Sequence, residues 1–206
     1  MLGAMKLHRE TVPDALLTLL CELMAAPALN AFHLVGGTAL ALRFGHRQSI
    51  DIDLFTEQPF DAPSLSNWLE STYPTIEIVT HENTVLTRIN GIKVDLIAHQ
   101  YALIDKPESF DGIRFLSIKD IAAMKLNAIA NRGSKKDFWD YALLLNHFDR
   151  EDMLSFFTKK YPNASRWNVE KSLCYFEDAE REPDPIDLSG QIWEQVKATI
   201  QRGNKL

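Results

Sequence analysis

The sequence predicts an α+β fold in which an α/β half is followed by an all-helical half. Between residues 32 and 97, short runs rich in β-branched residues occur, and two of them flank Asn90-Gly91, a pair typical of two-residue hairpins. After residue 117, apolar residues recur with helical spacing, and serines precede acidic residues by three positions, as in helix-capping boxes. A chain of 206 residues, 46% of them hydrophobic, can bury the core of such a fold.

Helices and strands are expected to alternate in the first half. Leucines at helical spacing predict a helix over residues 11–24, and an apolar run predicts a strand at 32–35. Gly36-Gly37 then opens a helix that ends near Phe44. The remaining elements of this half are a strand at 50–55, a helix at 63–71, a strand at 75–80 and hairpin strands at 85–89 and 92–97.

Only helices are expected in the second half, because strand signals fade after Gly112. Ser117 with Asp120 and Ser134 with Asp137 each form a capping-box pattern that predicts the start of a helix. The predicted helices lie at 118–131, 134–148, 152–160, 166–179 and 189–201, with an acidic, proline-punctuated connector at 182–185.

Composition limits the organisation and the partners of the protein. We expect an α/β core at 1–114 and a helical region at 115–206 that packs on it. The net charge of −6 argues against a general nucleic-acid-coating surface but does not exclude a local basic cleft. Without a long uncharged apolar run or a signal-peptide pattern, a soluble, cytoplasmic protein with no membrane partner is expected. Cys21 and Cys174 fit that compartment as buried small hydrophobes.

Two aspartates on one predicted strand form the first candidate site. Asp51 and Asp53 are separated by one residue, so they project from the same strand face, about 7 Å apart. Ile50, Ile52 and Leu54 are expected on the opposite face. Exposed acids on an edge strand are the alternative, but these apolar neighbours favour a strand inside the sheet. Paired carboxylates in such a place favour a hard divalent ion, which usually also binds substrate phosphates.

A third carboxylate, Asp95, lies in the second hairpin strand and shares a strand face with Lys93. Three acids on adjacent strands can hold two metal ions, one on a triphosphate and one that lowers the pKa of an attacking hydroxyl. Asp95 would lie nearest that hydroxyl and could act as its base. The expected cofactor is Mg²⁺, with Mn²⁺ as its substitute.

The Gly36-Gly37 turn is the candidate phosphate cradle. Glycines between a strand and a helix let the backbone approach a ligand, and a helix N-terminus attracts anions. A tight turn without a ligand is the alternative, but the paired aspartates begin only fourteen residues later and favour the cradle. Just before them, Arg47 is a candidate phosphate contact and Ser49 could fix the loop, with loop solvation as an equal alternative.

Two cations interrupt the apolar stripe of the predicted helix at 118–132. Lys125 and Arg132 are seven residues apart and therefore lie on one stripe, whereas Asp120 lies on the opposite, polar arc. A lone charge on an apolar face is costly. The two side chains either extend to solvent at the edge of the core or reach nucleotide phosphates or a nucleic-acid backbone.

Asp137 has two interpretations. As the third residue after Ser134 it could close a capping box, or it could orient Lys125 or Arg132 through a charge-assisted hydrogen bond. Asp140 is the weaker candidate for such a role. The neighbouring Lys135 and Lys136 are expected to be solvated charges.

Together these motifs resemble the AbiEii/AbiGii toxin family of nucleotidyltransferases, which shares the DNA polymerase β nucleotidyltransferase core. The likeness spans roughly residues 32–148. It rests on Gly36-Gly37-Thr38-Ala39-Leu40, on His46-Arg47-x-Ser49-x-Asp51-Ile52-Asp53-Leu54-Phe55, and on Lys125 and Arg132 followed by Lys136-Asp137-Phe138-x-Asp140. It implies a polymerase β-like mixed sheet with flanking helices, followed by a C-terminal helical bundle.

The resemblance also implies an activity, namely transfer of a nucleoside monophosphate from a nucleoside triphosphate to a hydroxyl, with Mg²⁺ and release of pyrophosphate. In toxins of type IV toxin–antitoxin systems the acceptor can be the 3′ end of tRNA, and a cognate antitoxin is encoded nearby. The catalytic candidates are Asp51, Asp53, Asp95 and Lys125, of which the three aspartates are the metal candidates. The nucleotide-binding candidates are Gly36, Gly37, Thr38, Arg47, Ser49, Arg132 and Asp137.

Three functions remain open from the sequence. The leading one is a Mg²⁺-dependent nucleotidyltransferase toxin acting on tRNA or another RNA. A second keeps the chemistry but uses a small-molecule acceptor, which the pI of about 5.5 favours. The third is a nucleotide-binding module that has lost catalysis and acts by protein contact, against which three intact acids argue.

Overall fold

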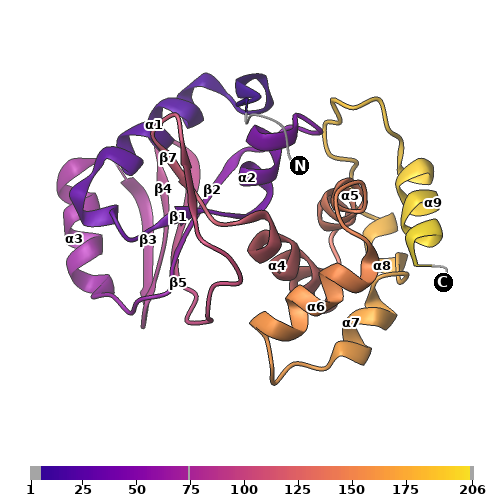
Figure 1. The fold of residues 1–206 in the computed structure, drawn as a ribbon. Helices are drawn as coiled ribbons and strands as arrows, with labels where there is room; N and C mark the ends of the chain where they lie inside the picture. Colours follow the sequence, from indigo (N-terminus) through magenta and orange to yellow (C-terminus); the bar gives the residue numbers. More distant parts are fainter. Residues whose placement is uncertain (1–5, 74, 205–206) are drawn as a thin grey trace.

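The first half of the chain is built around one mixed sheet. The computed structural model describes residues 6–73 and 75–204, and in this part seven strands pair in the order β3-β4-β5-β2-β1-β7-β6 (Figure 1). They are β1 (His33–Leu34), β2 (Asp51–Thr56), β3 (Thr75–His81), β4 (Thr84–Ile89), β5 (Ile92–Ala98), β6 (Glu108–Phe110) and β7 (Ile113–Phe115). β2 is parallel to β5 and antiparallel to β1, which makes the centre of the sheet mixed.

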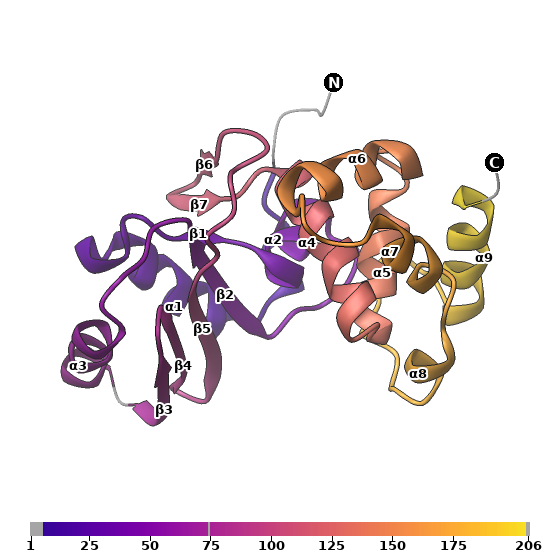
Figure 2. The ribbon, with the colours of Figure 1, turned by 90° about the horizontal axis from the view of Figure 1, so that it is seen from below.

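The helices lie on both sides of this sheet. The first half holds η1 (Arg9–Thr11), α1 (Asp14–Ala25), η2 (Pro27–Leu29), α2 (Gly36–Phe44) and α3 (Ala62–Thr72). The second half holds α4 (Ile118–Asn131), α5 (Lys135–Leu144), α6 (Arg150–Lys160), α7 (Arg166–Ser172), α8 (Glu177–Glu180) and α9 (Trp193–Gly203). α1 and α3 flank one side of the sheet, whereas α2 and α4 lie on the other (Figures 1 and 2).

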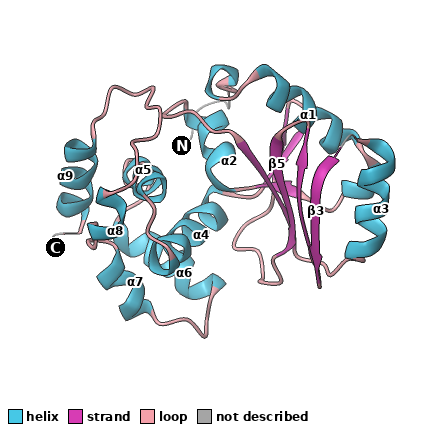
Figure 3. Cartoon of the chain, turned by 180° about the vertical axis from the view of Figure 1, so that it is seen from behind, coloured by secondary structure: helices cyan, strands magenta, loops and turns pink. Residues whose placement is uncertain are grey.

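Helix α4 connects the two halves. It lies beside the sheet, and α5, α6 and α7 pack against it from the side away from the sheet (Figure 3). These elements confirm the predicted α+β fold with a helical second half. None of the helices in the described part of the chain combines the length and hydrophobicity needed to cross a lipid bilayer.

Alternation along the central strands separates an apolar face from a polar one. Ile52 and Leu54 of β2, with Val94 and Leu96 of β5, are completely buried in the core. The residues between them point to the opposite face, where α4 lies, because successive strand side chains alternate. The carboxylates predicted on these strands therefore face the helical half.

The expectation that only helices follow Gly112 was wrong, because β7 begins at Ile113. β7 pairs in parallel with β1, through Leu34 and Phe115, and antiparallel with β6. Asp111 and Gly112 have φ values of 52° and 78°, which form a tight hairpin turn. Strands of three residues are too short to leave a clear periodicity. The predicted boundary between residues 114 and 115 falls inside β7, and the division into two domains stays a prediction.

Two further expectations about helical segments were wrong. The segment predicted as one helix at 166–179 forms α7 and α8 with a turn between them. Apolar residues recur at helical spacing across that turn, so their periodicity does not reveal the break: Val169, Leu173, Phe176 and Ala179. Cys21 and Cys174 are exposed rather than buried. Cys21 lies off the stripe of α1 that faces the core, which is Leu16, Leu19, Leu20, Leu23 and Met24.

Candidate active site

A cleft of about 650 Å³ lies between the carboxylate face of the sheet and α4. Its other walls are the N-terminus of α2, the loop at 47–50 and a segment at 185–186 that returns from the helical half. From α4 and its C-terminus the cleft is lined by Ile121, Met124, Lys125, Asn127, Ala128, Asn131 and Arg132. The stripe that carries Lys125 and Arg132 therefore faces the cleft, whose volume suits a small-molecule ligand.

The three predicted carboxylates lie together on the floor of this cleft. β2 and β5 pair in register, so Asp53 lies opposite Asp95, and Asp51 lies opposite Lys93. Lys93 Nζ donates to Asp95 Oδ2 at 2.6 Å. Ile50 was expected to point into the core, but β2 begins only at Asp51, and Ile50 is 65% exposed at the rim of the cleft.

The electrostatics of this floor favour a cation. Burial, and after it the neighbouring Asp95, raise the pKa of Asp53 above its ordinary value. Asp95 Oδ1 is buried and, among the described residues, has no hydrogen-bond partner. Both observations indicate uncompensated negative charge, which a divalent ion would relieve. Carboxylate oxygens are the ligands that Mg²⁺ and Mn²⁺ prefer, so the residues fit such an ion.

The carboxylates alone do not complete a coordination shell. Among residues 6–73 and 75–204, no three His, Cys, Asp or Glu side chains converge closely enough to hold a metal ion by themselves. Asp95 binds Lys93, and Asp51 Oδ2 lies 3.7 Å from Lys136 Nζ, so lysines stand at two of the three acids. Mg²⁺ sites commonly use one or two carboxylates together with substrate phosphates. A nucleotide would therefore supply the missing oxygens.

The glycine pair brings the N-terminus of α2 against the carboxylates. Gly36 has a φ of 71°, and a Cβ at this position would lie 2.5 Å from Asp53 Oδ2. A Cβ at Gly37 would overlap the guanidinium group of Arg47. Both positions therefore require glycine, and the positive end of the helix dipole faces the cleft, as a phosphate cradle requires.

Thr38 and Ser49 fix this turn to the start of β2. The Thr38 hydroxyl lies 2.8 Å from Ser49 Oγ and donates to the backbone carbonyl of Asp51. Ser49 lines the cleft, whereas Thr38 is 1% exposed and lies outside the lining that the described residues form. The hydrogen bonds give Thr38 a structural role, and its predicted nucleotide contact stays a prediction.

Gly36→Ala is expected to weaken nucleotide binding at least tenfold and to lower the free energy of unfolding by about 1–3 kcal/mol. The substitution places a strained φ and a methyl group against Asp53. Gly91→Ala is the matched control, because Gly91 also has a positive φ, of 79°, but a Cβ there meets nothing within 4 Å. Urea denaturation and nucleotide titration measure the two effects. Unchanged nucleotide affinity in Gly36→Ala would argue against the cradle.

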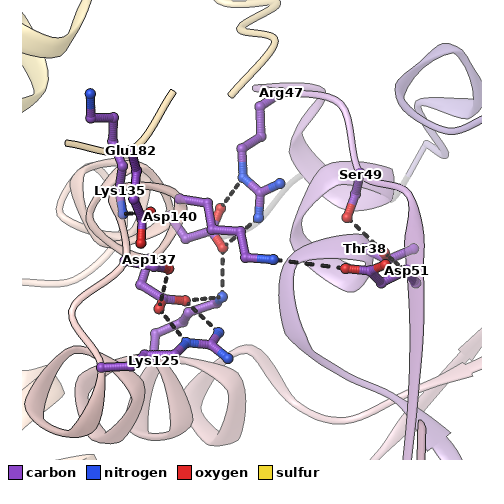
Figure 4. Close-up of polar contacts among 12 residues, drawn as sticks. Thr38, Arg47, Ser49, Asp51, Lys125, Lys135, Asp137, Asp140 and Glu182 are labelled. Carbon is purple, nitrogen blue, oxygen red and sulfur yellow. Dashed lines mark hydrogen bonds and ion pairs between the residues drawn. The ribbon is translucent and has the colours of Figure 1, made fainter. Parts of the chain in front are cut away.

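Two buried aspartates of α5 hold three cations beside the cradle (Figure 4). Asp140 accepts from Arg47 Nε at 2.7 Å and Nη2 at 2.8 Å, and it lies 2.7 Å from Lys125 Nζ. Asp137 accepts from Lys125 Nζ at 3.0 Å and from Arg132 Nε at 2.8 Å. Two carboxylates thus fix three cations, which leaves a surplus of positive charge at this end of the cleft.

The pairing keeps these groups charged. Burial alone would lower the pKa of Lys125, but Asp140 and Asp137 together raise it. Burial would likewise raise the pKa of both aspartates. Arg47 and Lys125 nevertheless hold the pKa of Asp140 well below its ordinary value, and Lys125 and Arg132 do the same for Asp137. The cations therefore remain in place for a polyanionic ligand.

Asp140 is more central than the sequence indicated. It is completely buried, and His46 Nε2 also lies 2.8 Å from its Oδ1. The available signal was its spacing from Asp137, because residues three apart share one helix face. For Asp137 the structure contains the hydrogen bonds to Lys125 and Arg132 that the orienting role requires, and Ser134 Oγ donates to its carboxylate at 2.7 Å instead of capping the helix backbone.

Lys135 and Lys136 were expected to be solvated, and for Lys135 this was wrong. Lys135 is 5% exposed, and its Nζ lies 3.0 Å from Asp184 of the acidic connector. Its backbone N–H donates to Glu182 at 2.8 Å (Figure 4). The connector folds back over the N-terminus of α5 and removes this lysine from solvent. Lys136 lines the cleft instead.

The opposite end of the cleft is aromatic and apolar. Phe55 and Ile97 continue the strand faces that carry the acids, and His99 and Tyr161 line the same end. His99 Nε2 lies 2.9 Å from the Tyr161 hydroxyl, and the two rings meet edge to face. Both ends therefore lie along the same strands, one charged and one aromatic.

A buried ion pair supports the aromatic end. Asp120 was expected on the polar arc of α4, and the structure buries it completely where α6 packs against α4. Its carboxylate accepts from Lys160 Nζ at 2.8 Å and from the backbone N–H of Ile104 at 3.0 Å. These two bonds join α4 to Lys160, which precedes Tyr161, and to Ile104 in the loop after β5.

Acidification is expected to destabilise the protein through His99. Burial, and then Lys160, lower the pKa of His99 from 6.5 to about 4. Between these values the unfolded chain binds a proton that the folded chain excludes, so the free energy of unfolding falls as the pH falls. His99→Asn should flatten this slope in urea denaturation, whereas His81→Asn, at an exposed histidine, should not. Equal slopes in all three proteins would refute the assignment.

Comparison with known proteins relates this geometry to a family. The model of a family described as "Nucleotidyl transferase AbiEii toxin, Type IV TA system" matches residues 18–205. An uncharacterized protein of Aquifex aeolicus (strain VF5) is 40% identical over 179 residues, which cover 84% of this chain and 86% of that protein.

Two solved structures share the fold. A putative nucleotidyltransferase from H. pylori superposes with a TM-score of 0.57 at 18% identity, covering 92% of this chain and 89% of that one. MenT4, a nucleotidyltransferase toxin from Mycobacterium tuberculosis H37Rv, superposes with a TM-score of 0.59 at 12% identity, covering 90% and 78% of the two chains. These likenesses confirm the predicted polymerase β-like mixed sheet with flanking helices. Because the family model spans most of the chain, this protein belongs to the AbiEii toxin family and is a nucleotidyltransferase.

Proposed function

We propose that the protein transfers a nucleoside monophosphate from a nucleoside triphosphate to the 3′-terminal hydroxyl of tRNA, with Mg²⁺ bound to Asp51, Asp53 and Asp95. The division of the cleft into a charged end and an aromatic end is the observation that carries this proposal. A triphosphate suits the end with a helix N-terminus and fixed cations. A base suits the end lined by Phe55 and Tyr161, because aromatic rings stack on bases.

The residues divide the work of the reaction. The acceptor oxygen attacks the α-phosphorus, the bond from that phosphorus to the bridging oxygen breaks, and pyrophosphate leaves with the electron pair. Asp95, whose buried Oδ1 has no hydrogen-bond partner within the described part of the chain, accepts the proton of the attacking hydroxyl. Lys125 and Arg132 stabilise the negative charge of the leaving group. When bound, Mg²⁺, or Mn²⁺ in its place, neutralises phosphate charge and lowers the pKa of the acceptor hydroxyl.

The proposal extends to the cellular partners. The description of the family names a type IV toxin–antitoxin system. This supports the proposal that a cognate antitoxin binds or counteracts this protein. A tRNA acceptor would place the reaction in the cytoplasm. The chain has a net charge of −6, so the contact with RNA would depend on the local cations of the cleft rather than on a basic surface.

Label transfer to defined acceptors tests the proposal. The protein is incubated with each labelled ribonucleoside triphosphate, Mg²⁺ and either intact tRNA or tRNA whose 3′ diol has been oxidised with periodate. We expect label only in intact tRNA. Label in an aminoglycoside but not in tRNA would favour a small-molecule acceptor. Metal-dependent nucleotide binding without transfer to either acceptor would favour a module that acts by protein contact. Either of these two results would overturn the proposal.

A further inference from the structure

Lys136 differs in its partner from Arg47, Lys125 and Arg132, the cations that the α5 aspartates hold. Arg47 and Lys125 are buried and fixed by Asp140 of α5. Lys136 leaves the first turn of α5 and reaches β2 across the cleft, where its Nζ lies 3.7 Å from Asp51 Oδ2. Its partner is therefore one of the proposed metal ligands.

The Lys136–Asp51 contact is weak. A separation of 3.7 Å is longer than a hydrogen bond, and the two side chains are 48% and 31% exposed. Ion pairs between groups this exposed contribute little, and the lysine stem is flexible. A divalent ion carries twice the charge of the ammonium group and takes carboxylate oxygens directly, so it would displace Lys136 from Asp51.

A displaced Lys136 would remain close to the reacting phosphates. Its side chain and Asp51 both line the cleft, together with Gly36 and Gly37 at the positive end of α2. An ammonium group with three donors can then bind the triphosphate oxygens that enter with the metal. Arg47 and Lys125 cannot move in this way without taking from the buried Asp140 the two cations that hold its charge.

We infer that Lys136 exchanges partners during substrate binding, neutralising Asp51 in the free protein and binding the triphosphate once a metal ion has taken Asp51. The inference rests on the proposed function. It requires two effects of opposite sign when the charge is removed: the metal alone should bind more tightly, because a competing cation is gone, and the metal–triphosphate should bind more weakly. A merely solvated lysine would produce neither effect.

Two probes that undergo no turnover test the exchange, namely Mn²⁺ alone and inorganic tripolyphosphate at saturating Mn²⁺, both by isothermal titration calorimetry. For Lys136→Met we expect the Kd for Mn²⁺ to fall about two- to fivefold and the Kd for tripolyphosphate to rise about tenfold. Lys136→Arg should keep most of the tripolyphosphate affinity. Lys119→Met is the matched control, because Lys119 is 42% exposed and lies 3.1 Å from Asp105, outside the cleft.

The outcomes separate the inference from the proposed function. If the wild-type protein binds neither probe, both are overturned. If the wild type binds both and Lys136→Met has the same affinities within about twofold, only the exchange is overturned. Weaker binding of Mn²⁺ alone would also overturn it, since the lysine would then support the metal site rather than compete for it. Equal unfolding midpoints in urea verify that the variants are folded.

Discussion

Asp53→Asn is expected to reduce kcat/KM for nucleotidyl transfer by at least about a thousandfold without unfolding the protein. Asp53 lies between the Gly36 turn and Asp95, so its carboxylate faces both the phosphate cradle and the third acid. An asparagine keeps the size of the side chain but removes the charge that a divalent ion needs. No other oxygen ligand on β2 can replace it, since Asp51 already occupies the neighbouring position of this face.

The same substitution is expected to preserve or raise stability, by up to about 1 kcal/mol. Burial and Asp95 raise the pKa of Asp53, which means that the folded protein holds this charge at a cost. Removing the charge relieves the repulsion from Asp95. A group that lowers stability while serving catalysis is typical of active sites.

Transfer rates and urea denaturation measure the two effects of Asp53→Asn together. Asp178→Asn, at an exposed aspartate of α8, is the control and should change neither. Transfer within about tenfold of the wild-type rate would remove Asp53 from the metal site. A large loss of stability would instead indicate that Asp53 supports the fold.

The central strands and their acids could be predicted because their signals are local. Asn90 and Gly91 have φ values of 51° and 79°, as the two-residue hairpin requires. Strand alternation alone places Asp51 and Asp53 on one face. The hairpin pairs β5 with β4, whereas the parallel pairing of β5 with β2 that sets Asp95 opposite Asp53 is a tertiary contact, which the local signals do not specify.

Helix periodicity predicted the faces of α4 but not what covers them. For Lys125 and Arg132 the sequence left two directions open, solvent at the edge of the core or a phosphate ligand, and both residues line the cleft. Asp120 was expected on the polar arc, yet it is completely buried and pairs with Lys160 of α6. A periodic pattern indicates that a helix has distinct faces, and the partner of each face depends on how distant segments pack.

The ion pairs of the cleft that join residues far apart in the sequence could not be predicted for the same reason. Asp140 pairs with His46 and Arg47, which lie 94 and 93 positions away, and Lys135 pairs with Asp184, which lies 49 positions away. Nothing in the local sequence around either residue identifies such a partner. Asp140 was therefore judged a weaker candidate than Asp137 for orienting the cations, because only local spacing was available. The tertiary contacts show that Asp140 holds as many cations as Asp137.

Asp140→Asn is expected to lower the free energy of unfolding by about 3–5 kcal/mol, because removing one partner of a buried ion pair leaves the others uncompensated. Asp140 is completely buried, and it pairs with both Arg47 and Lys125. In the variant, Lys125 keeps Asp137, but Arg47 loses its charged partner and one of its two hydrogen bonds, because an asparagine has only one acceptor oxygen. Asp178→Asn again provides the control, and a loss below about 1 kcal/mol at neutral pH would contradict this role.

The stability difference should also depend on pH. Burial alone would raise the pKa of Asp140, but Arg47 and Lys125 hold it well below its ordinary value of 3.8. The contribution is therefore complete above the unfolded-state pKa and is lost as the pH falls below it. Urea denaturation of wild type and variant should give curves that converge at acidic pH. A constant difference down to about pH 3 would show that the charge of Asp140 is not what stabilises the fold.

The kinetic effect of Asp140→Asn should differ in kind from that of Asp53→Asn. Asp140 reaches the substrate only through Arg47 and Lys125, so it acts as a positioning residue for the cations of the phosphate cradle. Loosened cations bind the triphosphate less well in the ground state, and we expect KM for the nucleotide to rise about tenfold or more with a smaller fall in kcat. Asp53→Asn, in contrast, should act mainly on kcat. If Asp140→Asn lowers kcat alone and leaves KM unchanged, the cations do not depend on Asp140 for their positions, and its role is confined to the fold.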